Sequence, residues 1–270
     1  MSFKLENKLV LVTGASSGIG KITAVEFARK GASLALVGRN ETALRETGAK
    51  IKHLGRPVKY FVFDLTQVDK IPALVGEIES RCSDGVDVLV NCAGTAILGL
   101  VEDVPVEEYG NNLQVNFYAP LALIKAVLPG MKQRGGGQII NVLSGAAKRG
   151  LPGSSAYCAS KAALNSLTES LRVELRGDNI DIISVSPGLV KTKFQQRAEY
   201  YGRWREIVPE SVMSDPEYVA RKIVQASIGQ RMNVELSLRT RLACHLNYLA
   251  PRLFDCLLAK KYKNQLSRPQ

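Results

Sequence analysis

Short apolar runs alternate with longer amphipathic stretches along most of the chain. The apolar runs are rich in valine, isoleucine and leucine, and they cover residues 8–13, 33–38, 58–63, 86–91, 137–142 and 180–185. Near-continuous apolar runs of this length are typical of strands that are buried on both faces. The stretches between them have helical periodicity, and we expect helices over residues 20–31, 40–55, 67–81 and 156–176. The alternation predicts stacked βαβ units.

The alternation of apolar runs and amphipathic stretches continues to about residue 190 and indicates the architecture. It predicts an α/β fold with a doubly wound, mostly parallel sheet of Rossmann type and helices on both faces. A further helix is expected over residues 215–230, with Pro216 at its first position, followed by a last strand near residues 233–236. The chain has no repeat of solenoid length and no proline- or glycine-rich linker. We therefore expect a single domain.

Composition narrows the class of protein. The chain has 270 residues, of which 46% are hydrophobic, so it can bury a core without a metal or a disulfide. Its five cysteines form no Cys-x-x-Cys pair and no cluster with histidine, which predicts reduced thiols and no metal site. The first residues lack an apolar signal-peptide core, and no run approaches the roughly 20 apolar residues that span a bilayer. We expect a cytoplasmic protein, with peripheral membrane contact as an alternative.

The net charge is strongly positive, at +11, which raises the question of an anionic partner. Much of the excess lies late in the chain, in residues 191–205 and 239–270. It does not gather on one helix that could enter a nucleic-acid groove. Nucleic acid is therefore not expected as a partner.

A glycine-rich turn follows the first expected strand. Gly14, Ser16 and Gly18 match the Gly-x-Ser-x-Gly nucleophile turn of α/β-hydrolases, but a serine nucleophile needs a histidine base. The chain has only His53, in an expected helix, and His245, in the basic tail. The other reading is a backbone cradle, in which small residues let a pyrophosphate approach the N-terminus of the next helix. The cradle is favoured, although its spacing departs from Gly-x-Gly-x-x-Gly.

The glycine-rich turn is the first of six short motifs that follow one another along the chain. The segment from Thr13 to Gly20, Thr-Gly-x-x-x-Gly-x-Gly, resembles the cofactor loop of the short-chain dehydrogenase/reductase family. The other motifs are "NCAG" at 91–94, "LQVNFYA", which places Asn116 inside an expected long helix, "NVLSG" with Ser144, "YCASK" with Tyr157 and Lys161, and "SPGLVKT" with Pro187, Gly188 and Thr192. Cys92 is the one departure, where the family carries asparagine. The resemblance covers residues 6 to 192.

The resemblance implies an oxidoreductase that transfers a hydride between a nicotinamide cofactor and a carbonyl or secondary alcohol. Residues 1–192 would form the dinucleotide-binding and catalytic core, and residues 193–270 a substrate lid and C-terminal extension of the same domain. The expected cofactor-binding residues are Thr13, Gly14, Ser16, Ser17, Gly18, Ile19, Gly20, Arg39, Asp64, Asn91, Ala93, Gly94, Tyr157, Lys161, Pro187, Gly188 and Thr192.

Tyr157 and Lys161 have a spacing with a chemical consequence. They are four residues apart and so share one helix face. A neighbouring ammonium group favours the phenolate and lowers a tyrosine pKa from its usual value near 10. The resemblance then implies that Tyr157 exchanges a proton with the substrate oxygen, and that Lys161 also holds the nicotinamide ribose. It further implies that Asn116 supports a water that links the lysine to solvent.

Ser144 is the expected partner of the substrate oxygen, which it would hydrogen-bond and orient. Ser144 could instead cap a turn, and Ser154 and Ser155 lie closer to Tyr157 in the sequence. The position of Ser144 at the end of a strand favours it over them. The intact set of Ser144, Tyr157 and Lys161 also argues against a catalytically silent, nucleotide-binding regulatory relative, which is the alternative function.

The cofactor type depends on the end of the second expected strand. An acid there would bind a ribose 2′-hydroxyl, whereas an arginine accommodates a 2′-phosphate. The chain has Gly38 and then Arg39, whose planar guanidinium suits a phosphate, so NADP(H) is expected. Arg39 could instead be a solvated loop residue, with Asn40 and Thr42 capping the next helix. Asp64 resembles the adenine-contacting aspartate of the family.

The last third of the chain is expected to decide the substrate. Residues 194–210 mix tyrosines and Trp204 with arginines, which fits a lid over a hydrophobic carbonyl or alcohol such as a lipid or steroid, or else a flexible loop. The tail from residue 239 interleaves leucines with basic residues, as in an interfacial amphipathic helix, but Pro251 would break it. Packing on the body or on a second subunit is favoured over membrane contact. By resemblance, a homodimer or homotetramer is expected.

Overall fold

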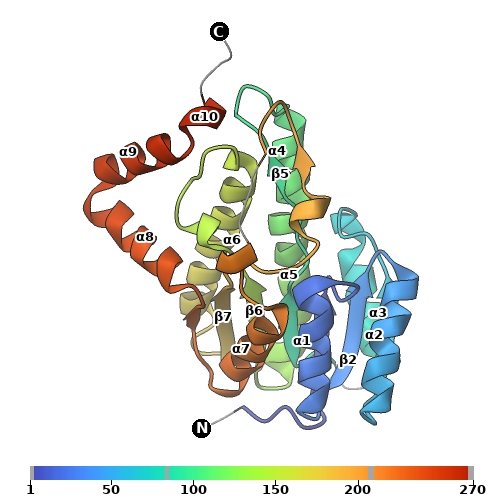
Figure 1. Cartoon of the computed structure of the whole chain (residues 1–270). Coiled ribbons are helices and arrows are strands. Elements are labelled where there is room, and N and C mark those ends of the chain that lie inside the picture. Colours follow the sequence, from blue (N-terminus) through green and yellow to red (C-terminus); the bar gives the residue numbers. More distant parts are fainter. Residues whose placement is uncertain (1–2, 83–84, 206–209, 267–270) are drawn as a thin grey trace.

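Seven parallel strands form the central sheet, in the order β3-β2-β1-β4-β6-β7-β9 (Figure 1). The computed structural model describes residues 3–82, 85–205 and 210–266. The strands are β1 (Leu9–Thr13), β2 (Ser33–Gly38), β3 (Val58–Val62), β4 (Val88–Asn91), β6 (Gly137–Val142), β7 (Ile180–Ser186) and β9 (Asn233–Glu235). All six predicted runs and the predicted last strand are therefore confirmed, and so is the Rossmann-type fold class.

Helices cover both faces of the sheet. Their bounds are α1 (Gly18–Arg29), α2 (Glu41–His53), α3 (Ile71–Cys82), α4 (Val106–Leu113), α5 (Ala119–Gln133), α6 (Ser155–Glu174) and α7 (Pro216–Ile228). Helices α1, α2 and α7 pack on one face, and α3, α5 and α6 pack on the other. The predicted helix at residues 215–230 starts at Pro216 as expected. This arrangement makes a single domain of two helical layers and one sheet.

The alternation of side chains along each strand divides the core into two halves. In β1, Val10 and Val12 face the layer of α1, α2 and α7, while Leu9 and Leu11 face the layer of α3, α5 and α6. All four are buried. Because successive side chains of a strand point to opposite faces, a run that is apolar throughout must be covered on both sides. The core therefore follows directly from the sequence pattern.

The strand order reverses between β1 and β4, which pair side by side although two βα units separate them in the chain. Helices that follow these two strands go to opposite faces of the sheet, so their connecting loops part at the carboxyl ends of the strands. Such a switch point leaves a crevice into which loops present their backbone. The glycine-rich turn after β1 and the "NCAG" turn after β4 both lie there.

A smaller two-stranded sheet and three C-terminal helices complete the described structure. β5 (Ile97–Leu98) pairs with β8 (Glu199–Tyr200). The C-terminal helices α8 (Leu238–Leu249), α9 (Pro251–Lys261) and α10 (Lys263–Leu266) lie to one side of the sheet (Figure 1). Pro251 does interrupt the tail, because α8 ends before it and α9 begins at it. Residues 206–209 of the expected lid and residues 267–270 of the tail lie outside the described residues.

Within the described parts of the chain, none of the helices is both long and apolar enough to cross a bilayer.

Candidate functional site

A cleft of about 890 Å³ opens at the carboxyl ends of the sheet strands. Most of the residues predicted for the site line it: Gly14, Ser16, Ser17, Gly18, Ile19, Gly20, Arg39, Asp64, Ala93, Gly94, Ser144, Tyr157, Lys161, Pro187, Gly188 and Thr192. Three predicted residues, Thr13, Asn91 and Asn116, are buried behind its wall. The fold thus brings together residues that are spread over most of the chain.

The glycine-rich turn is held in shape by backbone geometry. Gly14 has a φ of 69° and Gly18 a φ of 53°, values in the left-handed region that side chains other than glycine rarely adopt. Gly20 serves a different purpose, since a Cβ there would lie 2.5 Å from the carbonyl oxygen of Gly14. Thr13 fastens the turn to the neighbouring strand: its Oγ1 accepts hydrogen bonds from the backbone N–H groups of Cys92 (3.0 Å) and Ala93 (3.1 Å).

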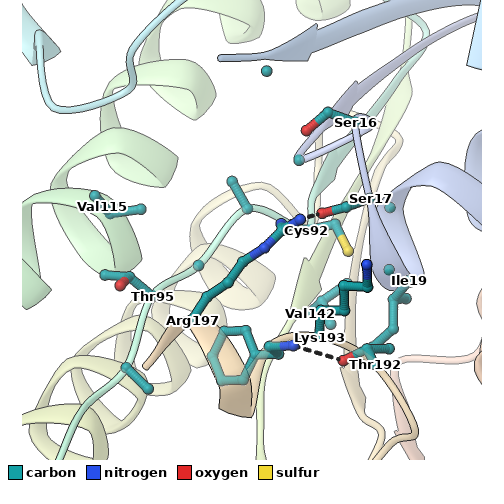
Figure 2. A pocket seen from close by; sticks show the side chains of 18 of the residues that line it. Ser16, Ser17, Ile19, Cys92, Thr95, Val115, Val142, Thr192, Lys193 and Arg197 are labelled. Carbon is teal, nitrogen blue, oxygen red and sulfur yellow. Dashed lines mark hydrogen bonds between the residues drawn. The ribbon is translucent and has the colours of Figure 1, made fainter. Parts of the chain in front are cut away.

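Helix α1 presents its N-terminus to the cleft. Its N-cap residue, Ser17, makes no side-chain capping hydrogen bond, and its Oγ instead accepts one from Arg197 Nη1 at 2.8 Å (Figure 2). The first-turn N–H groups and the positive end of the helix dipole are therefore turned toward the cleft, where an anion is stabilised. Together with the close approach that Gly14 and Gly20 allow, this geometry fits the pyrophosphate of a dinucleotide.

Helix α1 begins at Gly18, two residues before the predicted start. The reason is the extended backbone of Ser17, whose φ is −163°. The glycine-rich turn therefore ends at Ser17, and Gly18 and Gly20 belong to the first turn of the helix. The cradle and the helix start therefore overlap in the chain.

The end of β2 lies beside the glycine-rich turn. A Cβ on Gly38 would be 3.2 Å from Ser16 Oγ, so Gly38 leaves room next to that hydroxyl. Arg39 follows on the cleft wall and is exposed. Asn40 caps α2, because its Oδ1 accepts a hydrogen bond from the Ala43 N–H at 2.9 Å. Capping by Asn40 does not compete with a binding role for Arg39, since each residue uses its own side chain.

Tyr157 and Lys161 line the cleft from α6, and Ser144, which follows β6, lines it as well. Ser144 also caps the 3₁₀ turn at Gly145–Ala147, because its Oγ accepts a hydrogen bond from the Ala146 N–H at 3.2 Å. Lys161 is 5% exposed, and its Nζ donates a hydrogen bond to the Val142 carbonyl at 3.1 Å. Burial lowers the pKa of Lys161 to about 8, because a desolvated ammonium is disfavoured. The ring of Tyr157 packs against Phe194, with centroids 5.9 Å apart.

Asn116 lies in a five-residue π-helical stretch, Gln114–Tyr118, between α4 and α5, where the sequence predicts a regular long helix. Such turns often occur at functional sites. Asn116 Oδ1 accepts a hydrogen bond from the Thr95 N–H at 3.0 Å, and its Nδ2 lies 2.9 Å from each of the Thr95 carbonyl, Asn112 Oδ1 and Ser160 Oγ. The wider turn brings this side chain close to Lys161: a Cβ on Gly94 would lie 3.2 Å from Asn116 Oδ1 and 3.6 Å from Lys161 Nζ.

Asn91 and Cys92 belong to the "NCAG" turn but differ in position. Asn91 donates from Nδ2 to Asn141 Oδ1 at 2.8 Å and so links β4 to β6 behind the cleft. Cys92 lines the cleft itself. Desolvation raises the pKa of its thiol to about 12, against the opposing effect of nearby Lys161. The thiol therefore stays protonated near neutral pH and is a poor nucleophile.

The structure also shows where the alternative residues considered from the sequence lie. Ser155 is 2.6 Å from Tyr109 Oη, and neither it nor Ser154 lines the cleft, whereas Ser144 does. Neither His53 nor His245 is among the residues that line the cleft. A hydrolase base for Ser16 is therefore missing from this wall.

Among the lining residues that the sequence did not predict, two make contacts with predicted site residues. Arg197 crosses the cleft from the segment after β7 to Ser17, which is 180 positions earlier in the chain, and Phe194 covers Tyr157. Thr192 anchors this segment, because its Oγ1 accepts from the Phe194 N–H at 3.3 Å (Figure 2). Both residues lie in the segment 194–210, whose composition indicated a lid but did not indicate these contacts.

Comparison with known proteins agrees with this geometry. A family model described as short chain dehydrogenase matches residues 8–200. Dehydrogenase/reductase SDR family member 7B of Mus musculus is 33% identical over 271 residues, which cover 97% of this chain and 83% of that protein.

Two solved structures are similar in fold. One is a short chain dehydrogenase/reductase from Burkholderia phymatum in complex with NAD, with a TM-score of 0.83, 23% identity, and coverage of 93% of this chain and 96% of that one. The other is an alcohol dehydrogenase from the archaeon Thermococcus sibiricus complexed with 5-hydroxy-NADP, with a TM-score of 0.74, 25% identity, and coverage of 85% and 94%. Members of this family use a nicotinamide cofactor, act on small molecules and usually form oligomers. The chain belongs to the short-chain dehydrogenase/reductase family of oxidoreductases.

Proposed function

We propose that the protein is an NADP(H)-dependent oxidoreductase that transfers a hydride between the nicotinamide and a hydrophobic carbonyl compound or secondary alcohol. One observation carries the proposal: Ser144, Tyr157 and Lys161 line the same cleft as the uncapped N-terminus of α1. The N-terminus of α1 would hold the pyrophosphate of the cofactor, and the three side chains would lie at the same cleft. The nicotinamide supplies the hydride chemistry.

In this proposal each side chain has a separate task. Tyr157 gives a proton to the substrate oxygen during reduction and takes it back during oxidation. Lys161, as an ammonium group on the same helix face, favours the phenolate form of Tyr157 and binds the ribose. Ser144 orients the substrate oxygen by a hydrogen bond. Asn116, fixed by the buried contacts around Thr95, supports the path by which Lys161 exchanges protons with solvent.

The preference for NADP(H) rests on the end of β2. Gly38 puts no carboxylate beside Ser16, and Arg39 adds a guanidinium on the cleft wall. A planar, permanently charged fork suits a 2′-phosphate. Glu46, one of the acidic residues that line the cleft, is paired with Lys21 at 3.2 Å, which reduces its repulsion of a phosphate.

We expect Arg39→Ala to weaken NADPH binding at least about tenfold, because a charge-assisted contact contributes roughly 1.5–3 kcal/mol, and to leave NADH binding unchanged. Fluorescence titration with both cofactors measures this. Arg197→Ala serves as the comparison, since Arg197 contacts the glycine-rich turn and its loss is expected to weaken both cofactors alike. Equal losses for NADPH and NADH in Arg39→Ala would remove the argument for a 2′-phosphate site.

An apolar substrate fits the residues around Tyr157. Ala96, Leu98 and Trp204 form a buried cluster against which Tyr157 packs, with Tyr200 and Tyr262 at its margin. The lid assignment for residues 193–270 is part of the proposal. It is supported by the pairing of β8 with β5 and by the burial of Trp204, which is 1% exposed. From this cluster Ala96 and Tyr157 line the cleft, and with Val115 and Phe194 they offer hydrophobic contact area beside the proposed proton donor.

Lys161→Met tests the role of the buried ammonium group, and we expect two opposite effects. Activity should fall at least about a hundredfold. In the cofactor-free protein near pH 7, the free energy of unfolding should rise, by up to about 3 kcal/mol, because methionine carries no charge to desolvate. The difference in the free energy of unfolding between Lys161→Met and wild type should become smaller as the pH rises from about 8 toward 10.5. In this range the folded wild type has lost the Lys161 proton while the unfolded chain still holds it, so wild type gains stability.

Thermal unfolding at several pH values measures the difference in stability between Lys161→Met and wild type and its pH dependence. Lys125→Met, at an exposed position of α5, is the matched control and should change neither activity nor stability. A Lys161→Met protein that is less stable than wild type at pH 7 would contradict the desolvation argument.

The alternative function is a nucleotide-binding regulatory relative without turnover. It would bind NADPH with the same cleft but reduce no carbonyl compound. Steady-state assays over a panel of apolar aldehydes and ketones, run beside cofactor titrations, separate the two. Binding without turnover across the panel would favour the alternative.

A further inference from the structure

Helices α8 and α9 form a hairpin that differs on its two faces. We call residues 238–261 the α8–α9 hairpin. Its inner face contacts the body of the protein, and its outer face points away from the sheet (Figure 1). We propose that the outer face of the α8–α9 hairpin docks on an anionic lipid surface.

The inner face is pinned by specific contacts. Arg149, in the loop before α6, donates to Asn247 Oδ1 at 2.7 Å, pairs with Asp255 and lies over the Phe254 ring at 5.6 Å. Just beyond the hairpin, the Tyr262 ring packs on Trp204, with centroids 5.3 Å apart. These contacts hold both helices, so the outer face is presented in a fixed orientation.

The outer face of α8 is a stripe of exposed leucines. Leu238, Leu242 and Leu249 lie within about 40° of one another around the helix, given 100° per residue. Their exposed fractions are 60%, 58% and 79%. Tyr248, beside them, is 86% exposed. Single exposed apolar residues are ordinary on a protein surface, but a continuous stripe indicates an interaction site.

Helix α9 continues this surface. Leu253 and Leu257 are one helical turn apart and are 53% and 48% exposed. Phe254 and Leu258, which are each rotated about 100° around the helix from these leucines, are partly buried. The exposed leucines of α9 thus lie on the side that does not contact the body, as they do on α8.

The positive charge of the α8–α9 hairpin and of α10, which follows it, favours an anionic partner. Residues 238–266 contain six lysines and arginines and one acidic residue, Asp255, a net charge of +5 out of +11 for the chain. Asp255 is paired with Arg149, so its charge is offset within the protein. Exposed leucines flanked by cations are the composition of an interfacial helix on anionic lipid, where each Lys or Arg near the surface contributes about 1 kcal/mol.

A second copy of the chain is a poorer fit for the same surface. In a two-fold symmetric dimer a patch faces itself, so the cations around Leu253 would face the same cations of the other copy. That repulsion opposes burial of the leucines. An anionic lipid surface satisfies both the apolar and the charged residues.

The test is co-sedimentation of the full chain with vesicles of phosphatidylcholine alone or with added phosphatidylserine. We expect binding to the phosphatidylserine vesicles that weakens at high salt. Arg252→Glu with Lys260→Glu should lower the ratio of bound to free protein at least about tenfold, and Leu253→Ser with Leu257→Ser should lower it similarly. The matched controls, Lys50→Glu with Lys52→Glu on α2 and Val106→Ser with Val173→Ser, should bind as wild type does.

Three results would overturn the proposal. In the first, wild type binds neither kind of vesicle, and in the second, the hairpin variants bind as well as wild type does. In the third, wild type is an oligomer that does not bind vesicles, and sedimentation equilibrium shows that Leu253→Ser with Leu257→Ser dissociates it. The last result would assign the outer face to a second copy of the chain. Thermal unfolding confirms that each variant is folded. Because the readout is vesicle binding, it does not depend on cofactor or turnover, and its failure leaves the proposed function standing.

Discussion

Tyr157→Phe is expected to lower the rate of carbonyl reduction by about 10²- to 10⁴-fold, the usual contribution of a positioned acid or base. The change removes one oxygen and leaves the ring, which packs against Phe194 and the cluster around Trp204. The fold and the cofactor affinity should therefore stay as in wild type. Single-turnover reduction by bound NADPH, measured beside a cofactor titration, separates the chemical step from binding.

Tyr109→Phe is the matched control. Tyr109 also places a hydroxyl at α6, 2.6 Å from Ser155 Oγ, but it does not line the cleft. It should keep its rate within a few-fold of wild type. A Tyr157→Phe protein with nearly full rate would mean that another group supplies the proton, and loss of cofactor binding would mean that the hydroxyl has a structural role.

Gly20→Ala is expected to abolish cofactor binding and to destabilise the protein. The added Cβ would lie 2.5 Å from the Gly14 carbonyl oxygen, 2.8 Å from its carbon and 3.1 Å from the Thr13 carbonyl oxygen. These are backbone atoms of the turn itself, so the turn must open to accommodate the methyl group. Overpacking of this kind costs about 1–3 kcal/mol. NADPH affinity should fall at least about a hundredfold, because the cradle and the helix N-terminus separate.

Gly76→Ala is the comparison for that variant. Gly76 lies in α3 with nothing within 4 Å of the added Cβ, and alanine in a helix is favoured over glycine by up to about 1 kcal/mol. Gly76→Ala should thus be slightly stabilised and bind NADPH as wild type does. Thermal unfolding and cofactor titration of both variants test the pair. Normal NADPH binding by Gly20→Ala would show that the pyrophosphate lies elsewhere.

Local chemistry explains why much of the site could be predicted from the sequence. Gly14 and Gly18 adopt left-handed backbone angles, and Tyr157 and Lys161 share a face because they are four positions apart in a helix. Strand-end residues such as Ser144 meet the glycine-rich turn because the carboxyl ends of parallel strands share one edge of the sheet. The roles expected for these residues came from the resemblance to the short-chain family, whereas their positions follow from local backbone geometry and from the side-by-side pairing of parallel strands.

Other features depended on contacts between distant segments. The sequence around Asn116 predicts a regular helix, and only the network with Thr95 and Ser160 shows why the backbone widens there. The contact of Arg197 with the glycine-rich turn could not be predicted from the sequence. Its partner Ser17 is 180 positions away, and nothing in the sequence distinguishes Arg197 from the other arginines of the same basic segment.

The tail shows the same division between what the sequence determined and what the tertiary structure decided. Alternating leucines and basic residues, with Pro251 between them, were enough to determine two amphipathic helices, because helical periodicity and a proline break are local properties. Which side of each helix meets the body depends on where Arg149 and Trp204 lie after folding. The tertiary structure therefore decided that the inner side packs while Leu249 and Leu253 stay exposed, since burial is a property of the folded surroundings and not of the residue.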